Sequence, residues 1–289
     1  MYNEEELKRE ILAHYTEYLP GRYSNLTLDY REVPKVNGKQ EAFTLNDHED
    51  QTRPAPTGYL WQFMDMYRAY RGDFDKFMKW MTEFFTDALE GTMPFFQDID
   101  KVMIKENVVM TLVNTKRNEH ILKYAPTRKL MDLSILYRII VFDENDEIDT
   151  TVISNEIAEL MNLNEEQLYE AAVANTQTLL PPVMEPMNED GDFYVITNRT
   201  FANGAAAVLY ENLLSDLADM MESDIFLIPS SIHEMIAIPA ATCGFDALRS
   251  MIRDANENVV PEREVLSDNL YYYSRSEGKL SIAVREKCS

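Results

Sequence analysis

The sequence predicts an α+β protein, with a helix-rich N-terminal half that carries a β-hairpin and a C-terminal half in which helices pack on a mixed sheet. Three observations predict this fold class. Apolar residues recur at helical spacing over residues 74–89, and short apolar runs bounded by turn residues recur after residue 107. Asn37-Gly38 is a strong hairpin-turn signal between two candidate strands.

The length of 289 residues is compatible with two regions. A helical and hairpin region is predicted over 1–100 and an α/β-type mixed-sheet region over 101–289, with one continuous domain as the alternative. In the first region the predicted elements are a helix over 4–18, strands over 26–33 and 41–45, a loop over 48–56 and a helical segment over 58–90 that Gly72 divides.

The second region shows more and shorter apolar runs. Its predicted elements are strands over 107–114, 119–124 and 131–142, helices over 154–161 and 165–178, a loop over 185–192, a strand over 193–197, a helix over 205–221, strands over 225–228 and 235–238, a helix over 245–256 and a hairpin over 270–284. Asn164 is the predicted N-cap of the helix that starts at residue 165, with Gln167 at the capping-box position.

The net charge of −23 is concentrated in one stretch of the chain. Residues 142–224 hold 19 acidic side chains and one basic one, Arg199, whereas residues 101–141 hold 8 basic and 3 acidic side chains. The negative electric field of so many carboxylates repels nucleic-acid phosphates and anionic lipids, so we expect no direct nucleic-acid partner and no membrane partner. It favours a basic protein surface as the partner. The alternative is that these carboxylates only keep the protein in solution.

The candidate partner-binding residues are acidic side chains in three short segments of this stretch. They are Asp143, Glu144, Asp146, Glu147, Asp149, Glu165, Glu166, Glu189, Asp190 and Asp192. The hypothesis requires that such side chains gather on one face instead of scattering, and that basic groups of the same fold, over residues 116–138, do not neutralise them.

Signatures of common enzyme classes are missing from the sequence. It contains no phosphate-binding loop ending in Gly-Lys-Ser/Thr, no Gly-x-Gly-x-x-Gly and no Gly-x-Ser-x-Gly. His233-Glu234 resembles the start of a zinc-protease helix, but Ala237 stands where the second histidine is required. The acidic turn near residue 146 has Ile148 where a calcium loop needs glycine. We therefore expect no metal and no cofactor.

One polar segment, Pro229-Ser230-Ser231-Ile232-His233-Glu234, lies between two apolar strands. Ser230 or Ser231 as nucleophile, His233 as base and Glu234 as its orienting group would form a catalytic set, and Cys243 with His233 is a second pairing. The competing interpretation is a tight turn in which the serines bond to backbone and His233 and Glu234 bond locally. The sequence favours the turn.

Three stretches carry a resemblance to a known family: Ile228–Glu234, Val265–Tyr271 and Leu163–Thr176. In these the chain resembles an uncharacterised conserved-domain family of gut anaerobic, clostridial-type bacteria and their mobile elements, which has a PSSxHE segment. That family has no assigned function, so the resemblance implies no catalytic residue. Its link to mobile elements implies a narrower version of partner binding, an inhibitor or decoy of a basic nucleic-acid-handling protein.

These observations lead to two functional hypotheses. The first is a non-enzymatic, strongly acidic partner-binding protein, and the alternative is a hydrolase-type enzyme that uses His233 with Ser230, Ser231, Glu234 or Cys243. An acidic start without an apolar run, together with only two cysteines, predicts a cytoplasmic protein with reduced thiols. The oligomeric state is left open.

Overall fold

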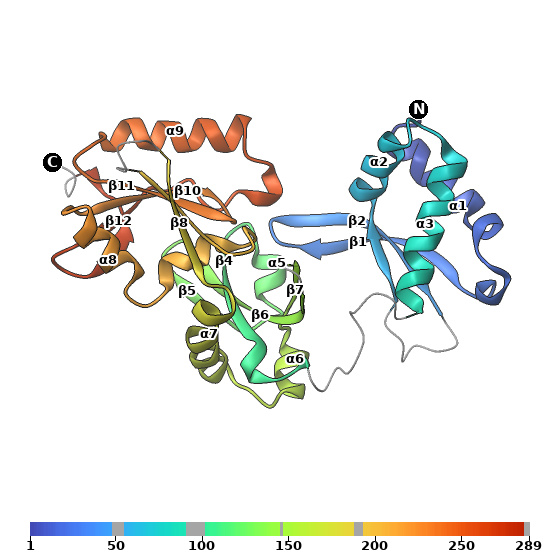
Figure 1. Ribbon diagram of the computed structural model, residues 1–289, viewed down its shortest axis with the longest axis horizontal. Coiled ribbons are helices and arrows are strands. Elements are labelled where there is room, and N and C mark those ends of the chain that lie inside the picture. The colour runs from blue at the N-terminus through green and yellow to red at the C-terminus, as the bar shows by residue number, and fades with distance from the viewer. Residues whose placement is uncertain (48–54, 91–101, 145–146, 188–192, 286–289) are drawn as a thin grey trace. The chain divides into compact units, whose positions relative to one another are not determined.

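The computed structural model describes residues 1–47, 55–90, 102–144, 147–187 and 193–285, except the side chains of residues 142–144 and 147 (Figure 1). The chain forms two compact units. The first contains residues 1–35 and 39–99, and the second contains residues 36–38 and 100–289. Both combine helices with antiparallel strands, so the fold class is α+β, with a helix-rich N-terminal half that carries a hairpin.

In its described residues, the first unit contains three α-helices and a three-stranded sheet of order β1-β2-β3. Its elements are α1 (Glu4–Tyr18), β1 (Thr27–Lys35), β2 (Gly38–Asn46), β3 (Thr57–Tyr59), α2 (Leu60–Ala69) and α3 (Phe74–Leu89). A capping box between Asn3 and Glu6 starts α1. The positive φ of Gly72, +80°, allows the chain to turn between α2 and α3.

The Met and Phe stripe of α3 lies in the core of this unit. Phe77, Met78, Met81 and Phe85 are each at most 1% exposed, and they pack with Phe63 of α2 in one apolar cluster. The stripe therefore serves as core, which is the usual role of an apolar helix face.

The second unit contains a four-stranded and a six-stranded sheet, the latter of order β13-β12-β10-β11-β9-β8. Its strands are β4 (Val108–Asn114), β5 (Thr127–Leu130), β6 (Leu133–Glu144), β7 (Glu147–Val152), β8 (Pro182–Pro186), β9 (Tyr194–Asn198), β10 (Ile225–Ser231), β11 (Glu234–Pro239), β12 (Tyr271–Ser274) and β13 (Lys279–Ile282). Its helices are α5 (Glu119–Leu122), α6 (Asn155–Leu160), α7 (Glu165–Leu179), α8 (Leu213–Met220) and α9 (Phe245–Asn258).

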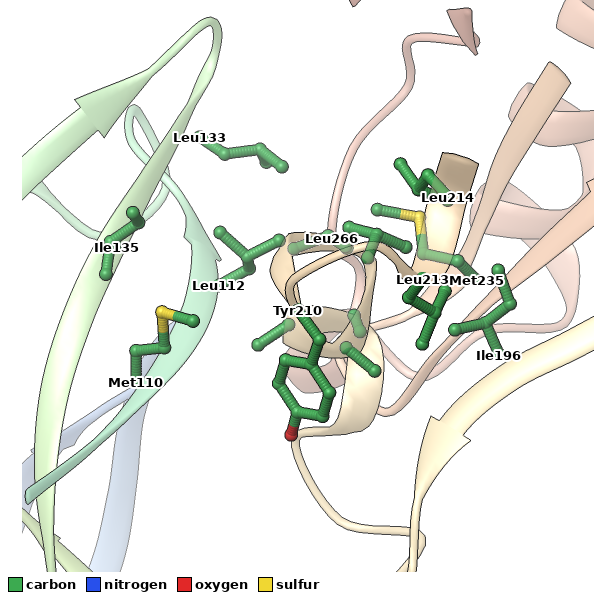
Figure 2. Packing of buried hydrophobic residues seen from close by; sticks show 14 of the residues in the cluster. Met110, Leu112, Leu133, Ile135, Ile196, Tyr210, Leu213, Leu214, Met235 and Leu266 are labelled. Carbon is green, nitrogen blue, oxygen red and sulfur yellow. The ribbon is translucent and has the colours of Figure 1, made fainter. Parts of the chain in front are cut away.

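The main core of the second unit lies between its two sheets. Figure 2 shows Met110 and Ile135 of the four-stranded sheet on one side, and Met235 and Ile196 of the six-stranded sheet on the other. The other face of the six-stranded sheet packs against α9 in a separate apolar cluster (Figure 1). Both faces of β10 are therefore covered, which explains its continuous apolar run.

The structure differs from the sequence prediction at several elements. Residues 119–124, predicted as a strand, contain the short helix α5, and the strands β5 and β7 were not predicted. The predicted loop over 185–192 begins within β8, an edge strand whose two prolines need no ladder hydrogen bond on their open side. The paired strands of the second unit are antiparallel, where a mixed sheet was expected.

Candidate functional site

The polar segment at 229–234 forms the tight connection between β10 and β11, with a bulge between Pro229 and Ser231. The Ser230 hydroxyl donates to Glu234 Oε1 at 2.8 Å, and the backbone N–H of His233 donates to Ser231 Oγ at 3.0 Å. These contacts are those of a side-chain-stabilised turn. In the described structure neither serine hydroxyl is hydrogen-bonded to the His233 ring.

The half-buried ring of His233 is bound to a neighbouring loop. Its Nδ1 accepts the backbone N–H of Asn203 at 3.1 Å, and its carbonyl accepts the hydroxyl of Thr197 at 2.8 Å. Because a backbone N–H can only donate, Nδ1 carries no proton and the neutral ring has its proton on Nε2. The contacts of His233 thus hold the loop at residue 203 against the β10–β11 turn.

Cys243 occupies a different place in the second unit. It is half-buried and packs against the apolar cluster beneath α9, which includes Phe226 and Leu248. The turn therefore brings Ser230, Ser231, His233 and Glu234 together, while Cys243 belongs to another cluster. Among the described residues, no candidate nucleophile is hydrogen-bonded to the His233 ring. The hydrolase alternative therefore stays a prediction.

Glu165, a predicted partner-binding residue, is engaged inside the fold. Both of its carboxylate oxygens accept bonds from Arg128 of β5, at 3.0 and 2.9 Å, and it also accepts the hydroxyl of Tyr137, which is fully buried. The Arg128 guanidinium lies 3.7 Å from the ring centre of Tyr169. Hydrogen bonds from Arg128 and Tyr137 lower the pKa of Glu165, and burial raises the pKa of Tyr137.

Glu166 next to it is placed differently. Its side chain is 64% exposed and forms an ion pair with Arg128 at 2.6 Å. One turn later the exposed Glu170 lines a groove of about 380 Å³ between α7 and the 105–107 turn. Glu106, Gln167 and Asn175 line it as well, and we call this cavity the α7 groove.

The other predicted partner-binding residues are mostly outside the described side chains. Asp149 of β7 is exposed. Side chains that lie outside the described part are Asp143, Glu144, Asp146, Glu147, Glu189, Asp190 and Asp192.

The acidic stretch is divided between separate elements. Exposed carboxylates lie on α6, on α7 and on α8, and α8 lies apart from the other two in Figure 1. Asp219 of α8 is paired with Arg275 at 2.8 Å. The described part therefore offers local acidic surfaces instead of one continuous face.

Two cations of the basic stretch are used inside the second unit. Arg128 is bound by Glu165 and Glu166. Arg138 of β6 donates to the hydroxyl and the carbonyl of Thr150, at 2.7 and 2.8 Å, and burial lowers its pKa to about 10. Part of the local positive charge thus stabilises the four-stranded sheet.

A polar network that the sequence does not reveal joins two distant segments of the second unit, at residue 132 and at residues 267–271. Asp132 accepts the Ser267 hydroxyl at 2.6 Å and the Tyr271 hydroxyl at 2.9 Å, and both donors are 1% exposed. Ser267 Oγ also accepts the N–H of Asn269 at 2.9 Å. Burial raises the pKa of Tyr271. The only sequence signal was the polar Ser-Asp-Asn within an apolar stretch.

We expect Ser267→Ala to lower the free energy of unfolding by about 1–2 kcal/mol. The substitution removes one donor to Asp132 and the acceptor of the Asn269 N–H in a buried place. Urea unfolding followed by circular dichroism measures the change, with the exposed Ser276→Ala as control. Equal unfolding midpoints for the two variants would contradict the role of Ser267.

Neither a metal cluster nor a membrane span is found within the described residues. No group of three or more His, Cys, Asp or Glu side chains there is arranged to hold a metal ion. Among the described helices, none combines the length and the apolar content that crossing a membrane requires.

The model of one protein family, the family of unknown function DUF5688, matches residues 4–190 and 185–275. No curated protein and no solved structure matches the chain. The match agrees with the resemblance to an uncharacterised domain family, and it carries no information on host bacteria, mobile elements or the PSSxHE segment.

Proposed function

The chain belongs to this family of unknown function, and we propose that it is a non-enzymatic protein that binds a basic protein partner. Because the described carboxylates do not form one continuous face, the proposal is limited to a local acidic surface. The observation that carries the proposal is the imbalance of 19 acidic side chains to one basic side chain over residues 142–224. Pairing with Arg128 and Arg275 accounts for few of these carboxylates. An excess of exposed carboxylates attracts a cationic surface and speeds its encounter.

The α7 groove is the part of this surface best suited to receive a basic side chain. Its polar lining consists of two exposed carboxylates, Glu106 and Glu170, the amides of Gln167 and Asn175, and one exposed cation, Lys105. The Asn175 amide donates to the carbonyl of Lys105 at 2.7 Å, which ties α7 to the opposite wall. A partner lysine or arginine would find two negative charges, against the single positive charge of Lys105, together with neutral acceptors.

In its narrower form, the proposed partner is a basic protein that handles nucleic acid. A basic protein that handles nucleic acid has a cationic channel, and an acidic protein that occupies it acts as an inhibitor or decoy. The resemblance to a family found on mobile elements of gut anaerobes supports this form. We propose that it acts in the cytoplasm, in keeping with the free thiol of Cys243.

Affinity capture from a native lysate at low and at high salt tests the proposal. We expect a basic protein to be retained at low salt and released at high salt, because contacts between exposed charges are screened. Glu106→Gln combined with Glu170→Gln should reduce retention of that same protein by about tenfold.

The matched control removes two exposed carboxylates elsewhere in the second unit, through Glu257→Gln and Glu277→Gln. Both double variants change the net charge equally. A difference in retention between them therefore shows that the position of the carboxylates matters, and not only their number. Retention that does not depend on salt, or an equal loss in both variants, would refute the proposal.

A further inference from the structure

A second cavity of the second unit, of about 740 Å³, lies beside the polar network of Asp132. We call it the β4–β5 groove. It lies at the C-terminal ends of β4 and β5, and the segment before β12 forms one of its sides. Its lining residues are Asn114, Thr115, Lys116, Arg117, Glu119, Lys129, Met131, Asp132, Asp268 and Asn269. The volume is within the range of cavities that hold small molecules.

Three cations line this groove in a chain of net charge −23. Lys116 and Lys129 are exposed, and neither forms an ion pair or a hydrogen bond with the described residues. Arg117 has only a long contact, 3.8 Å, with Glu262, whose side chain is 87% exposed. A surface pair of this kind contributes little and leaves the guanidinium available.

The lining also carries three carboxylates, those of Glu119, Asp132 and Asp268, and none of them forms an ion pair with these cations among the described residues. Both oxygens of Asp132 accept hydroxyl groups, from Ser267 and Tyr271. Asp268 Oδ1 accepts the amide of Asn256 at 2.8 Å. These bonds hold Asp132 in the wall of the groove, whereas Asp268 and Glu119 are exposed at its surface.

The walls of the groove are held by hydrogen bonds between its segments. The N–H of Thr115 donates to the carbonyl of Asp132 at 3.0 Å, and the amide of Asn114 donates to the carbonyl of Leu266 at 3.1 Å. The N–H of Arg117 donates to Asn114 Oδ1 at 3.1 Å. A cavity whose walls are fixed before binding loses less conformational entropy when it takes a ligand.

We propose that the β4–β5 groove binds a small phosphorylated molecule, with its phosphate held by Lys116, Arg117 and Lys129. A phosphate monoester carries about −1.5 to −2 charge near neutral pH and three acceptor oxygens, so it matches three cations better than a single carboxylate does. Arginine binds phosphate in a bidentate way and lysine binds it as a point charge. The half-buried Met131 offers an apolar contact to the organic part. This site is independent of the proposed partner surface.

Titration calorimetry with ribose 5-phosphate and with pyrophosphate tests the proposal on the full chain. We expect binding of at least one probe, and Lys116→Gln combined with Lys129→Gln should weaken it by about tenfold or more. Both lysines are exposed and without described partners, so the variant should unfold at the same urea concentration as the wild type.

The matched control is Arg253→Gln combined with Lys279→Gln, which removes two exposed cations elsewhere in the same unit. It should bind the probes as the wild type does. Three results would overturn the proposal: no heat from either probe up to about 10 mM, an equal loss in both double variants, or binding of citrate as tight as that of the phosphorylated probes.

Discussion

Gly204→Ala is expected to lower the free energy of unfolding by about 3 kcal/mol. A Cβ at this position would lie 2.2 Å from Thr197 Oγ1, 2.6 Å from the carbonyl oxygen of His233 and 2.7 Å from the backbone nitrogen of Asn198. Two of these atoms are backbone, in β9 and in the β10–β11 turn, so they cannot rotate away. The 203–204 loop would have to move off the turn that binds it.

Gly244→Ala is the matched control. Both glycines lie at the start of a helix, Gly204 as the first residue of a 3-10 helix and Gly244 as the N-cap of α9, but a Cβ added at Gly244 would have no neighbouring atom within 4 Å. We expect that variant to differ from the wild type by no more than about 0.5 kcal/mol. Urea unfolding gives both values. If the two substitutions lower the free energy of unfolding equally, the close packing of the 203–204 loop on the β10–β11 turn does not contribute to stability.

Glu165→Ala is expected to cost about 2–3 kcal/mol, whereas Glu166→Ala should cost about 1 kcal/mol or less. Both residues stand in the first turn of α7, so each variant loses the same favourable charge at the helix N-terminus. Only Glu165→Ala leaves the buried hydroxyl of Tyr137 without its acceptor and removes the bidentate partner of Arg128. Unfolding in urea near pH 7 gives the difference between the two.

The effect of Glu165 also depends on pH. Its pKa in the folded protein lies below its ordinary value of 4.5, mainly because Arg128 donates to its carboxylate. A depressed carboxyl pKa stabilises the fold above the unfolded value, and that contribution is lost as the pH falls through the folded value. The gap between wild type and Glu165→Ala should therefore narrow below about pH 4.5. A gap that stays constant down to pH 3 would contradict the ion pair.

Local signals in the sequence were enough to locate many elements. The helix α1 has the predicted bounds, and α7 starts at Asn164 with the capping box to Gln167 that the sequence predicted. The hairpin turn at Asn37 has the positive φ, 62°, that asparagine tolerates. Each of these features depends on residues within a few positions of one another, so a single sequence reveals it.

Elements that depend on a distant partner were predicted less well. The strand β5 has four residues, none of them fully buried, and only its ladder with β6 makes it a strand. The strand β8 carries prolines at both ends and was not predicted, and its last two residues fall in the predicted loop over 185–192. Short edge strands have weak propensity of their own, because their stability comes from the neighbouring strand.

The candidate sites divide in the same way. Ser230, His233 and Glu234 were found because they are neighbours in sequence, while Asp132 and Ser267, which are hydrogen-bonded across the fold, were not. Sequence spacing does not reveal a pair that is 135 residues apart. The same holds for the β4–β5 groove, whose lining comes from three segments.

By itself, the sequence determined the fold class, the starts of α1, α7 and α9, the hairpin turn at Asn37 and the strong excess of acidic residues after position 142, since all of these are local or additive properties. Only the tertiary structure decided which charges are available. Glu165 and Glu166 are adjacent and chemically identical, yet one is bound to Arg128 and a buried tyrosine and the other is 64% exposed. That difference arises because successive residues of a helix point in directions about 100° apart, and only one of them meets the sheet.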